Sequence, residues 1–327
     1  MGLLAGPGFA TAASPTLGSN ESYGEQGVTE PDDRADDTNP IDDGPAPGSE
    51  MRGSEVWLST GIRYSQNLSI DPDRIEDSSS PVALTHLDGY DQRGLLGWEL
   101  RSIGWAGYEV DLQDKDRDFQ NVSGQTGPVL HLGESWDFYG SVGGGLSFFG
   151  YDFYSAIGAT YLRLESLEGS FLRAVELDVG YERTGDSLGG DDAPWIDLYT
   201  TVGRDSLVLE ADWIELTPLL SFYLSDDDDF AYGQIGATLE YGFSVAANLE
   251  VKASWTGYRR VYDLAEDGPS PRQRDWFLLA QLDIRYSGLF IDSLAVEVTG
   301  SYERNWSNFG DEEYEGGSVA IVLHWKF

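Results

Sequence analysis

Cysteine is absent from this chain and histidine occurs only three times, so the residue types that most often carry nucleophilic or metal chemistry are scarce. Without cysteine there can be no disulfide, thiolate metal site or cysteine nucleophile. The histidines are His86, His131 and His324, and a serine hydrolase would need one of them beside a serine on a neighbouring element. Several serines satisfy that condition for each histidine, so the pattern selects no pair. We predict no enzymatic activity and no cofactor.

Two acidic loops carry oxygen ligands of the kind that hard cations prefer. The first holds Asp71, Asp73, Glu76 and Asp77, and the second is the run at 226–229. Neither follows the twelve-residue spacing of a calcium-binding loop. We interpret both as solvated acidic loops and predict no metal site.

The charge of the chain excludes one class of partner. The 327 residues have a formal charge of −37 and a pI near 4.1, whereas a nucleic-acid partner requires a basic surface. The mean hydropathy is −0.33 and no apolar run approaches the length of a membrane helix. Aromatic residues make up 13% and there are 40 glycines, which is unlike a disordered chain and favours an all-β fold.

The first fifty residues differ in composition from the rest. Residues 1–13 are mildly apolar and end in Ala-Thr-Ala-Ala, which resembles the remnant of a signal peptide with its small-residue cleavage site. An ordinary frayed terminus is the alternative. Residues 14–50 are acidic, rich in proline and glycine, and almost without apolar side chains. Such a segment buries too little surface to offset its ordering entropy, so we predict a disordered acidic arm.

Residues 51–327 alternate apolar and polar side chains, the period of a β-strand. The last strand is the clearest, with Val319, Ile321, Leu323 and Trp325 on one face. We predict fourteen strands near 55–67, 92–102, 105–113, 119–132, 136–148, 151–165, 171–184, 195–203, 206–224, 230–243, 248–262, 274–286, 292–306 and 315–327. The segment 206–224 is taken as one long strand with a bulge near Pro218; counts of twelve or sixteen strands stay open.

The connections between these strands alternate in length. Long ones are predicted at 68–91, 185–194, 263–273 and 307–314, and short ones at 103–104, 133–135, 166–170, 204–205, 244–247 and 287–291. This alternation is typical of an antiparallel up-and-down transmembrane barrel, with short turns on one side of the membrane and long loops on the other. A soluble β-sandwich or propeller is the alternative.

The aromatic residues favour the barrel. We place all ten tryptophans on the apolar face near strand ends, as in the aromatic girdles of membrane barrels: Trp57, Trp98, Trp105, Trp136, Trp195, Trp213, Trp255, Trp276, Trp306 and Trp325. The final Phe327 closes an alternating strand and resembles the signal by which the insertion machinery recognises Gram-negative outer-membrane barrels. The resemblance implies outer-membrane lipid and that machinery as partners, and a periplasmic arm at 14–50.

The strand pattern assigns a side to each charge, because a charged side chain facing lipid at the membrane midplane costs about 2–4 kcal/mol. Sixteen acids and six bases then face the lumen, a net of −10. The acids are Glu99, Glu109, Asp111, Asp137, Glu165, Glu176, Asp178, Glu182, Asp197, Glu210, Asp212, Glu240, Glu250, Asp283, Glu297 and Glu303, and the bases are Arg63, Arg101, Arg163, Lys252, Arg285 and Lys326.

An acidic lumen favours cations, so we predict a pore for small cationic or neutral solutes. The same charges would also suit an ion-pair ladder that does not conduct. A second hypothesis is a barrel that translocates or anchors a partner protein through the arm at 14–50 or the long loops. A third is an interfacial lipid hydrolase.

A second family resemblance supports the protein-translocation alternative. The segment at 61–72, GIRYSQNLSIDP, is similar to the start of the barrels of surface-lipoprotein assembly modifiers, and 123–136 is similar to a strand of that group. Ser65-Gln66 departs from the Asp-Ser that is usual there, and the helical repeats that precede such barrels are absent.

Overall fold

The computed structural model describes residues 53–69, 78–95, 98–113, 118–149, 152–167, 171–184, 192–209, 212–225, 231–262, 273–308 and 313–327. In these ranges no helix is long and apolar enough to cross a membrane. The predicted segments at 1–13 and 14–50, and the acidic runs at 71–77 and 226–229, lie outside the described residues.

Fourteen strands account for nearly all of the described chain. They are β1 Gly53–Ser69, β2 Ser78–Leu95, β3 Trp98–Asp111, β4 Phe119–Leu132, β5 Trp136–Phe149, β6 Asp152–Ser166, β7 Leu172–Thr184, β8 Ala193–Asp205, β9 Asp212–Tyr223, β10 Tyr232–Ala246, β11 Leu249–Tyr262, β12 Arg274–Ser287, β13 Leu294–Ser307 and β14 Tyr314–Lys326.

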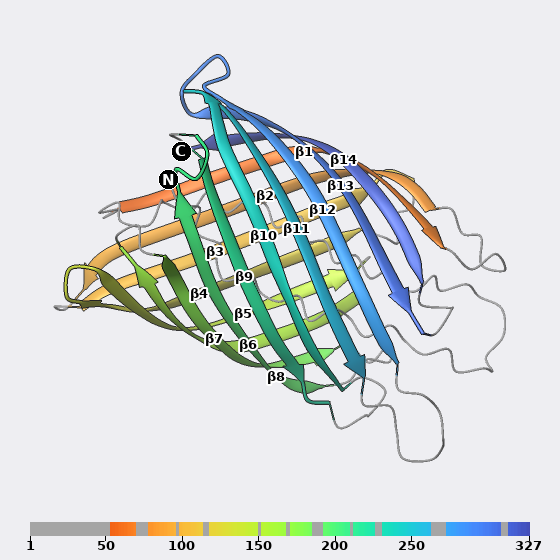
Figure 1. Ribbon diagram of the computed structural model, residues 1–327, viewed down its shortest axis with the longest axis horizontal. Coiled ribbons are helices and arrows are strands. Elements are labelled where there is room, and N and C mark those ends of the chain that lie inside the picture. The colour runs from red at the N-terminus through yellow and green to blue at the C-terminus, as the bar shows by residue number, and fades with distance from the viewer. Residues whose placement is uncertain are drawn as a thin grey trace.

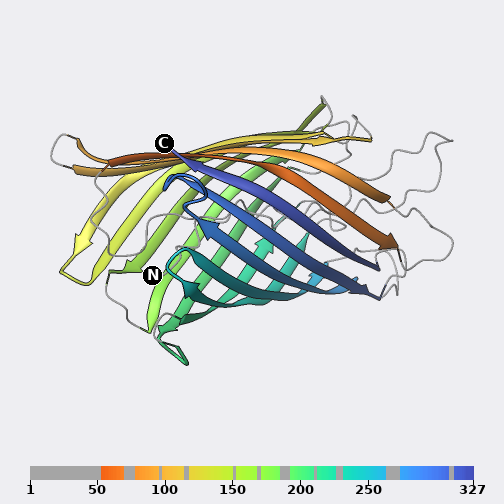
Figure 2. The same ribbon diagram turned by 90° about the horizontal axis from the view of Figure 1, so that it is seen from above.

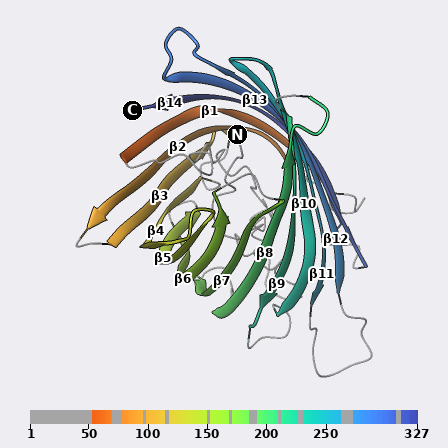
Figure 3. The same cartoon turned by 60° about the vertical axis from the view of Figure 1, so that its left-hand side comes forward.

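The strands form one closed barrel in which each pairs antiparallel with its neighbours in sequence (Figures 1 and 2). The ring closes where β1 pairs with β14, in a register that runs from Trp57 opposite Lys326 to Ser69 opposite Tyr314. The predicted all-β, up-and-down antiparallel barrel and its count of fourteen strands are therefore confirmed. Figure 3 shows the strands surrounding a common interior.

The sequence prediction was wrong about β2 and β3. Most of the loop expected at 68–91 belongs to β2, and the turn expected at 103–104 lies in the middle of β3, where Gly104 pairs with Gly89 and Gly124. The reason is that Val82 and Leu84 of β2 turn inward, with 1% and 7% of their surface exposed. Apolar residues therefore occur on both faces of β2, since Leu87 is exposed on the outer face, and this weakens the alternation by which a strand is recognised; the glycines of β2 and β3 resemble turn signals.

The long strand expected at 206–224 was also wrong. Residues 206–209 form a turn, and β9 begins only at Asp212. There is no bulge at Pro218: the pairs Tyr199–Leu219 and Val202–Leu216 keep one register on either side of it. An apolar run at 207–209 imitates a strand, but the Asp212 carboxylate accepts hydrogen bonds from all three of its backbone N–H groups and holds it as a turn.

Neighbouring side chains on a strand point to opposite sides of the wall. On β1, Ile62 and Tyr64 are 58% and 49% exposed, whereas Arg63 between them is 3% exposed. The outer face is apolar along the strands, with Val142, Ile235 and Leu282 among its exposed residues. Charged side chains gather on the inner face, as expected for a barrel with lipid outside.

Six of the ten tryptophans lie on the outer face as predicted, although Trp255 is in the middle of β11 and not near its end, and four do not lie on the outer face. Trp57 and Trp105 fall on the inner parity of their strands, and Trp195 and Trp213 are buried there, 3% and 4% exposed. Each buried indole covers an inward-facing glycine on the next strand, Gly180 for Trp195 and Gly242 for Trp213. Indole rings thus fill places in the wall where no side chain competes for space.

The seam between β1 and β14 depends on the glycine at position 61. A Cβ atom there would overlap the carbonyl oxygen of Ile321 and lie 2.9 Å from the Cα atom of Val322. The two strands approach this closely because no side chain separates them.

We expect Gly61→Ala to lower the free energy of unfolding by about 1–3 kcal/mol, because overpacking forces the closing strands apart. Gly158→Ala on β6 is the matched control, since a Cβ atom there meets nothing within 4 Å. Urea titration in phospholipid vesicles, read by gel mobility of the folded barrel, measures both variants. Equal stability would contradict the close approach at the seam.

Candidate functional site

The inner wall is the candidate site, and most of the predicted lumen residues lie on its parity. They are Arg63, Glu99, Arg101, Glu109, Asp111, Asp137, Arg163, Glu165, Glu176, Asp178, Asp197, Glu240, Lys252, Asp283, Arg285 and Glu297. Glu182, Glu250, Glu303 and Lys326, which the strand pattern also assigned to the lumen, share this parity. Glu210 lies outside the described residues.

Asp212 does not face the lumen. It falls on the same parity of β9 as Leu216 and Phe222, which are exposed on the outer face. Its carboxylate is buried under the β8–β9 turn, where it also accepts a hydrogen bond of 2.9 Å from the Tyr241 hydroxyl. The error follows from the bulge assumed near Pro218, which placed the even residues of this segment inward. The inward acid on β9 is Glu215, 4% exposed, which the prediction missed.

The first ion-pair network joins β1, β2 and β3. Arg63 donates to both carboxylate oxygens of Glu109, at 2.7 and 3.5 Å. The His86 Nε2 atom lies 3.9 Å from the same carboxylate. A bidentate pair of this kind is among the stronger charge-assisted contacts in proteins.

A second network crosses β3 to β7. Arg101 donates to Glu165 at 2.7 Å, and its guanidinium lies 5.1 Å from the centre of the Tyr139 ring. Arg163 bridges Glu165 at 3.2 Å and Glu176 at 3.1 Å. Two arginines and two glutamates therefore form this network, and each arginine is within ion-pair distance of at least one of the glutamates.

Beyond Glu176 the wall carries acids without matching bases. Asp178 on β7 lies directly opposite Asp197 on β8, and they are 0% and 1% exposed. Among the described residues, neither oxygen of Asp178 and only one of Asp197 has a hydrogen-bond partner; the Tyr199 hydroxyl donates to Asp197 at 3.3 Å. Buried carboxylates of like charge this close together favour a nearby cation or proton.

The third network lies on β10 to β13. The Lys252 Nζ atom is 3.8 Å from both Glu240 and Asp283. The Thr299 hydroxyl contacts Asp283 at 2.9 Å and Glu297 at 3.1 Å. Arg285, opposite Glu297 on β13 and Glu250 on β11, is the second inward base of this region, where Lys252 and Arg285 face Glu240, Glu250, Asp283 and Glu297.

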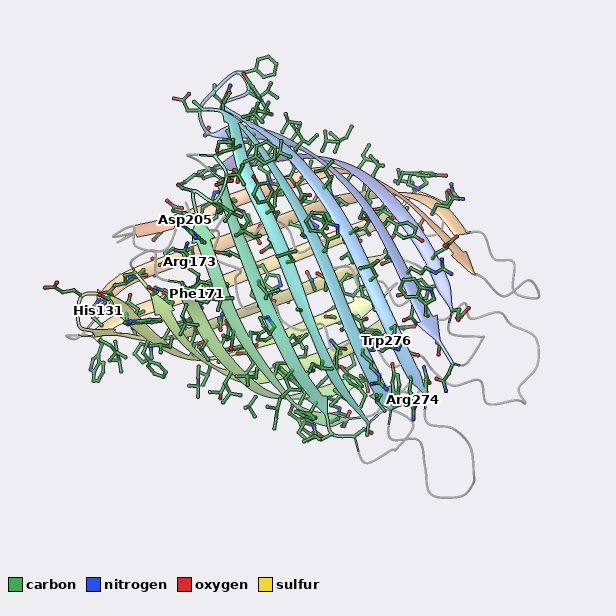
Figure 4. All side chains as sticks on the ribbon, in the orientation of Figure 1. His131, Phe171, Arg173, Asp205, Arg274 and Trp276 are labelled. Atoms are coloured by element: carbon green, nitrogen blue, oxygen red, sulfur yellow. The ribbon has the colours of Figure 1, made fainter. Side chains whose placement is uncertain are left out.

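Two inward arginines were missed at the level of sequence. Arg173 pairs with Asp205 at 2.8 Å and lies 3.9 Å from Glu215, next to an irregular register between Leu172 and Ala174. Figure 4 shows Arg173 and Asp205 together at the short-turn end of the barrel. Because the register shifts here, period-2 counting along β7 assigns Arg173 to the wrong face.

Arg260 is the other missed base, and it lies among aromatic rings rather than carboxylates. Its guanidinium is 4.3 Å from the centre of the Tyr232 ring and donates to the Tyr262 hydroxyl at 3.1 Å and to Gln234 at 2.9 Å. Tyr232 stacks on Tyr223 with 5.5 Å between ring centres. An aromatic cluster therefore covers the inner wall at the long-loop end of β9 to β11.

The histidines have different environments. Ser59 and His324 form a buried hydrogen bond of 2.9 Å between β1 and β14, but on the inner face, where lipid does not reach them. His131, at the opposite rim from the long loops, contacts Asp137 at 2.6 Å and Glu99 at 2.9 Å (Figure 4). The geometry therefore gives no support to a lipid hydrolase. No cluster of metal-ligating side chains occurs in the described part of the chain.

We expect Arg163→Ala to destabilise the barrel by about 3–5 kcal/mol, because it leaves Glu165 and Glu176 buried with less compensating charge. The exposed pair of Arg93 and Asp91 provides the control, and Arg93→Ala is expected to leave stability unchanged. Urea titration in vesicles measures both variants. Adding Glu176→Gln to Arg163→Ala should recover part of the loss, and failure to do so would argue against the charge explanation.

No protein-family model and no curated protein matches the sequence. Among solved structures, OmpT, an outer membrane protein of Vibrio cholerae, is similar with a TM-score of 0.47 at 10% identity, covering 84% of this chain and 98% of that one. OccAB4 of Acinetobacter baumannii gives 0.41 at 9%, covering 84% and 98%. An anion-selective porin from Comamonas acidovorans gives 0.43 at 11%, covering 84% and 99%.

These values are too low to carry an argument about function, so the assignment depends on the barrel itself. Its ring is closed, its strands are antiparallel and even in number, and its outer face is apolar with tryptophans near the rims. Most of the charged side chains on its strands lie on the inner face. These are the properties of a transmembrane β-barrel, in which the backbone N–H and C=O groups form hydrogen bonds between strands because no water is available in the lipid. The chain therefore has the fold of a transmembrane β-barrel, closed by fourteen antiparallel strands.

Proposed function

We propose that this barrel is an outer-membrane channel for small cationic or neutral solutes, with selectivity set by its acidic inner wall. The observation that supports it is the unequal pairing of the wall charges. Arg63, Arg101, Arg163 and Lys252 all contact carboxylates, whereas Asp178 and Asp197 form no ion pair with a base in the described part of the chain. The bases are used locally and a negative field remains.

Asp178 on β7 and Asp197 on β8 contribute to that field without an ion-pair partner in the described part of the chain. Coulomb attraction between unit charges about 4 Å apart is about 1 kcal/mol in bulk water and larger beside a protein wall. A cation that passes Asp178 and Asp197 gains this attraction, and an anion meets the corresponding repulsion. Rings and clusters of carboxylates select cations in channels for this reason.

The ion pairs are compatible with this function because they stabilise the contacts between strands of the wall. Arg101 on β3 pairs with Glu165 on β6, and Arg163 on β6 joins Glu165 to Glu176 on β7, so these contacts connect β3, β6 and β7 on the inner side of the sheet. A ladder without conduction would use the same contacts, but it would not require acids without a base. The protein-binding alternative depends on residues 14–50 and the long loops, and stays a prediction.

Planar-bilayer recording under a salt gradient tests the channel. We expect a reversal potential that indicates cation selectivity, and we expect Asp178→Asn combined with Asp197→Asn to lower the cation-to-anion permeability ratio about fivefold, the equivalent of about 1 kcal/mol. Asp91→Asn, on the outer face, removes a charge of the same sign and is the matched control.

The control should retain the selectivity of the unmodified barrel. Anion selectivity or the absence of conductance in the unmodified barrel would refute the channel. An unchanged ratio in the double variant would show that the β7–β8 acids do not set the selectivity.

A further inference from the structure

The outer face carries an unusual group of residues at the long-loop end of β11 to β13. Arg259, Arg274 and Arg304 all lie there, on the parity that elsewhere is apolar, together with Trp276 and Trp306. We call these five residues the rim patch. Figure 4 shows Arg274 and Trp276 at this end of β12, far from the labelled residues of the short-turn rim.

The strand register brings the members of the rim patch together. Arg259 lies opposite Trp276, and Trp276 lies opposite Trp306 on the next strand. Arg274 and Arg304 are each two residues from one of these tryptophans on the same face. With strands about 4.8 Å apart and about 3.4 Å per residue, the three arginine Cα atoms lie within roughly 8–14 Å of one another. Their long side chains can reach a shared ligand.

The guanidinium groups are held against the indoles. The Arg259 carbon Cζ is 5.3 Å from the centre of the Trp276 ring, and that of Arg304 is 4.9 Å from the centre of the Trp306 ring. Cation–π contacts fix the direction of a guanidinium and leave its N–H groups available to an acceptor. The arrangement resembles a set of oriented hydrogen-bond donors on a flat aromatic platform.

The charges of the rim patch are incompletely compensated. Within the described residues no carboxylate pairs with Arg259 or Arg274, and the Nε atoms of Arg259 and Arg304 are buried without a hydrogen-bond partner. Arg304 has one acid nearby, Glu315, at 3.6 Å, whose carboxylate also accepts from the Tyr302 hydroxyl. Uncompensated arginines on a lipid-facing surface are unfavourable unless an anion meets them.

The sign of the patch is notable in a chain with a formal charge of −37. A lipid surface is anionic through its phosphates, and guanidinium groups match phosphate oxygens in a bidentate geometry. Below the patch, the outer face continues with the exposed apolar residues Leu282, Ile284 and Trp255, which suit acyl chains. Phosphate above and apolar surface below is the pattern of a lipid lying along the wall.

We propose that the rim patch binds the phosphorylated sugar headgroup of a glycolipid in the outer leaflet. The arginines bind the phosphates, the indoles pack against the sugar, and the apolar wall beneath holds the acyl chains. Long loops of barrels of this type lie outside the cell, which places the patch at the outer leaflet. The proposal does not depend on conduction through the lumen.

The test uses the full-length barrel refolded in detergent, with binding of bisphosphorylated lipid A measured by native mass spectrometry. We expect the triple variant Arg259→Gln, Arg274→Gln and Arg304→Gln to bind lipid A about tenfold or more weakly than the unmodified barrel. Arg93→Gln with Arg204→Gln removes outward-facing arginines at the short-turn rim and is the matched control; its affinity should be unchanged.

Two further probes identify the ligand. Dephosphorylated lipid A and inorganic phosphate should each bind much more weakly than intact lipid A, because the site requires phosphate and acyl chains together. Gel mobility verifies that every variant is folded. Equal affinity of the triple variant and the unmodified barrel, an equal loss in the control, or equal binding of either probe would overturn the proposal.

Discussion

The structure depends on one constraint: every backbone hydrogen bond of a strand in lipid must be made within the protein. A sheet satisfies this only when its edges meet, and here they meet between β1 and β14, in an unbroken register from Trp57 to Ser69. Closure requires strands that continue through the full wall, which the chain builds from fourteen antiparallel segments. It also makes side chains alternate between lipid and interior wherever the register is regular, so that Ile62 and Arg63 occupy opposite environments although they are adjacent.

This alternation explains why so many charges are buried. The lipid face cannot accept them, so they collect on the inner wall, where each must find a partner or remain costly. Arg163 between Glu165 and Glu176 shows the paired solution. Asp178 and Asp197, which lie directly opposite each other on the adjacent strands β7 and β8, show the case in which no base pairs with the acid among the described residues. In the proposed channel, a passing cation would supply the missing counter-charge at this stretch of wall.

The fold was predictable from the sequence wherever apolar residues face lipid, as they do along β14 with Val319, Ile321 and Leu323. The prediction failed where apolar side chains lie on the inner face of a strand. Val82 and Leu84 turn inward, which weakens the apolar signal on the lipid face of β2. Trp195 shares the parity of the inward Asp197, so its position was missed because tryptophan was taken by type to face lipid, and Trp213 was misplaced by the bulge assumed near Pro218. The inward position of most charged residues could be predicted from their parity in the strand. Their ion-pair partners could not, because the networks join different strands, and only the assembled barrel defines the register between them.

The adjacent residues Arg259 and Arg260 show how one strand serves two environments. Arg259 lies against Trp276 on the outer face, while Arg260 lies among Tyr232, Tyr258 and Tyr262 on the inner face. Both are arginines held by aromatic rings, but one faces the lipid boundary and the other a filled interior with 4% exposure. The same cation–π contact therefore has different consequences. On the outer face the contact orients a guanidinium at the surface of the wall. On the inner face it stabilises a buried guanidinium, which lies opposite Asp275 on the neighbouring strand and offsets part of the charge of that carboxylate.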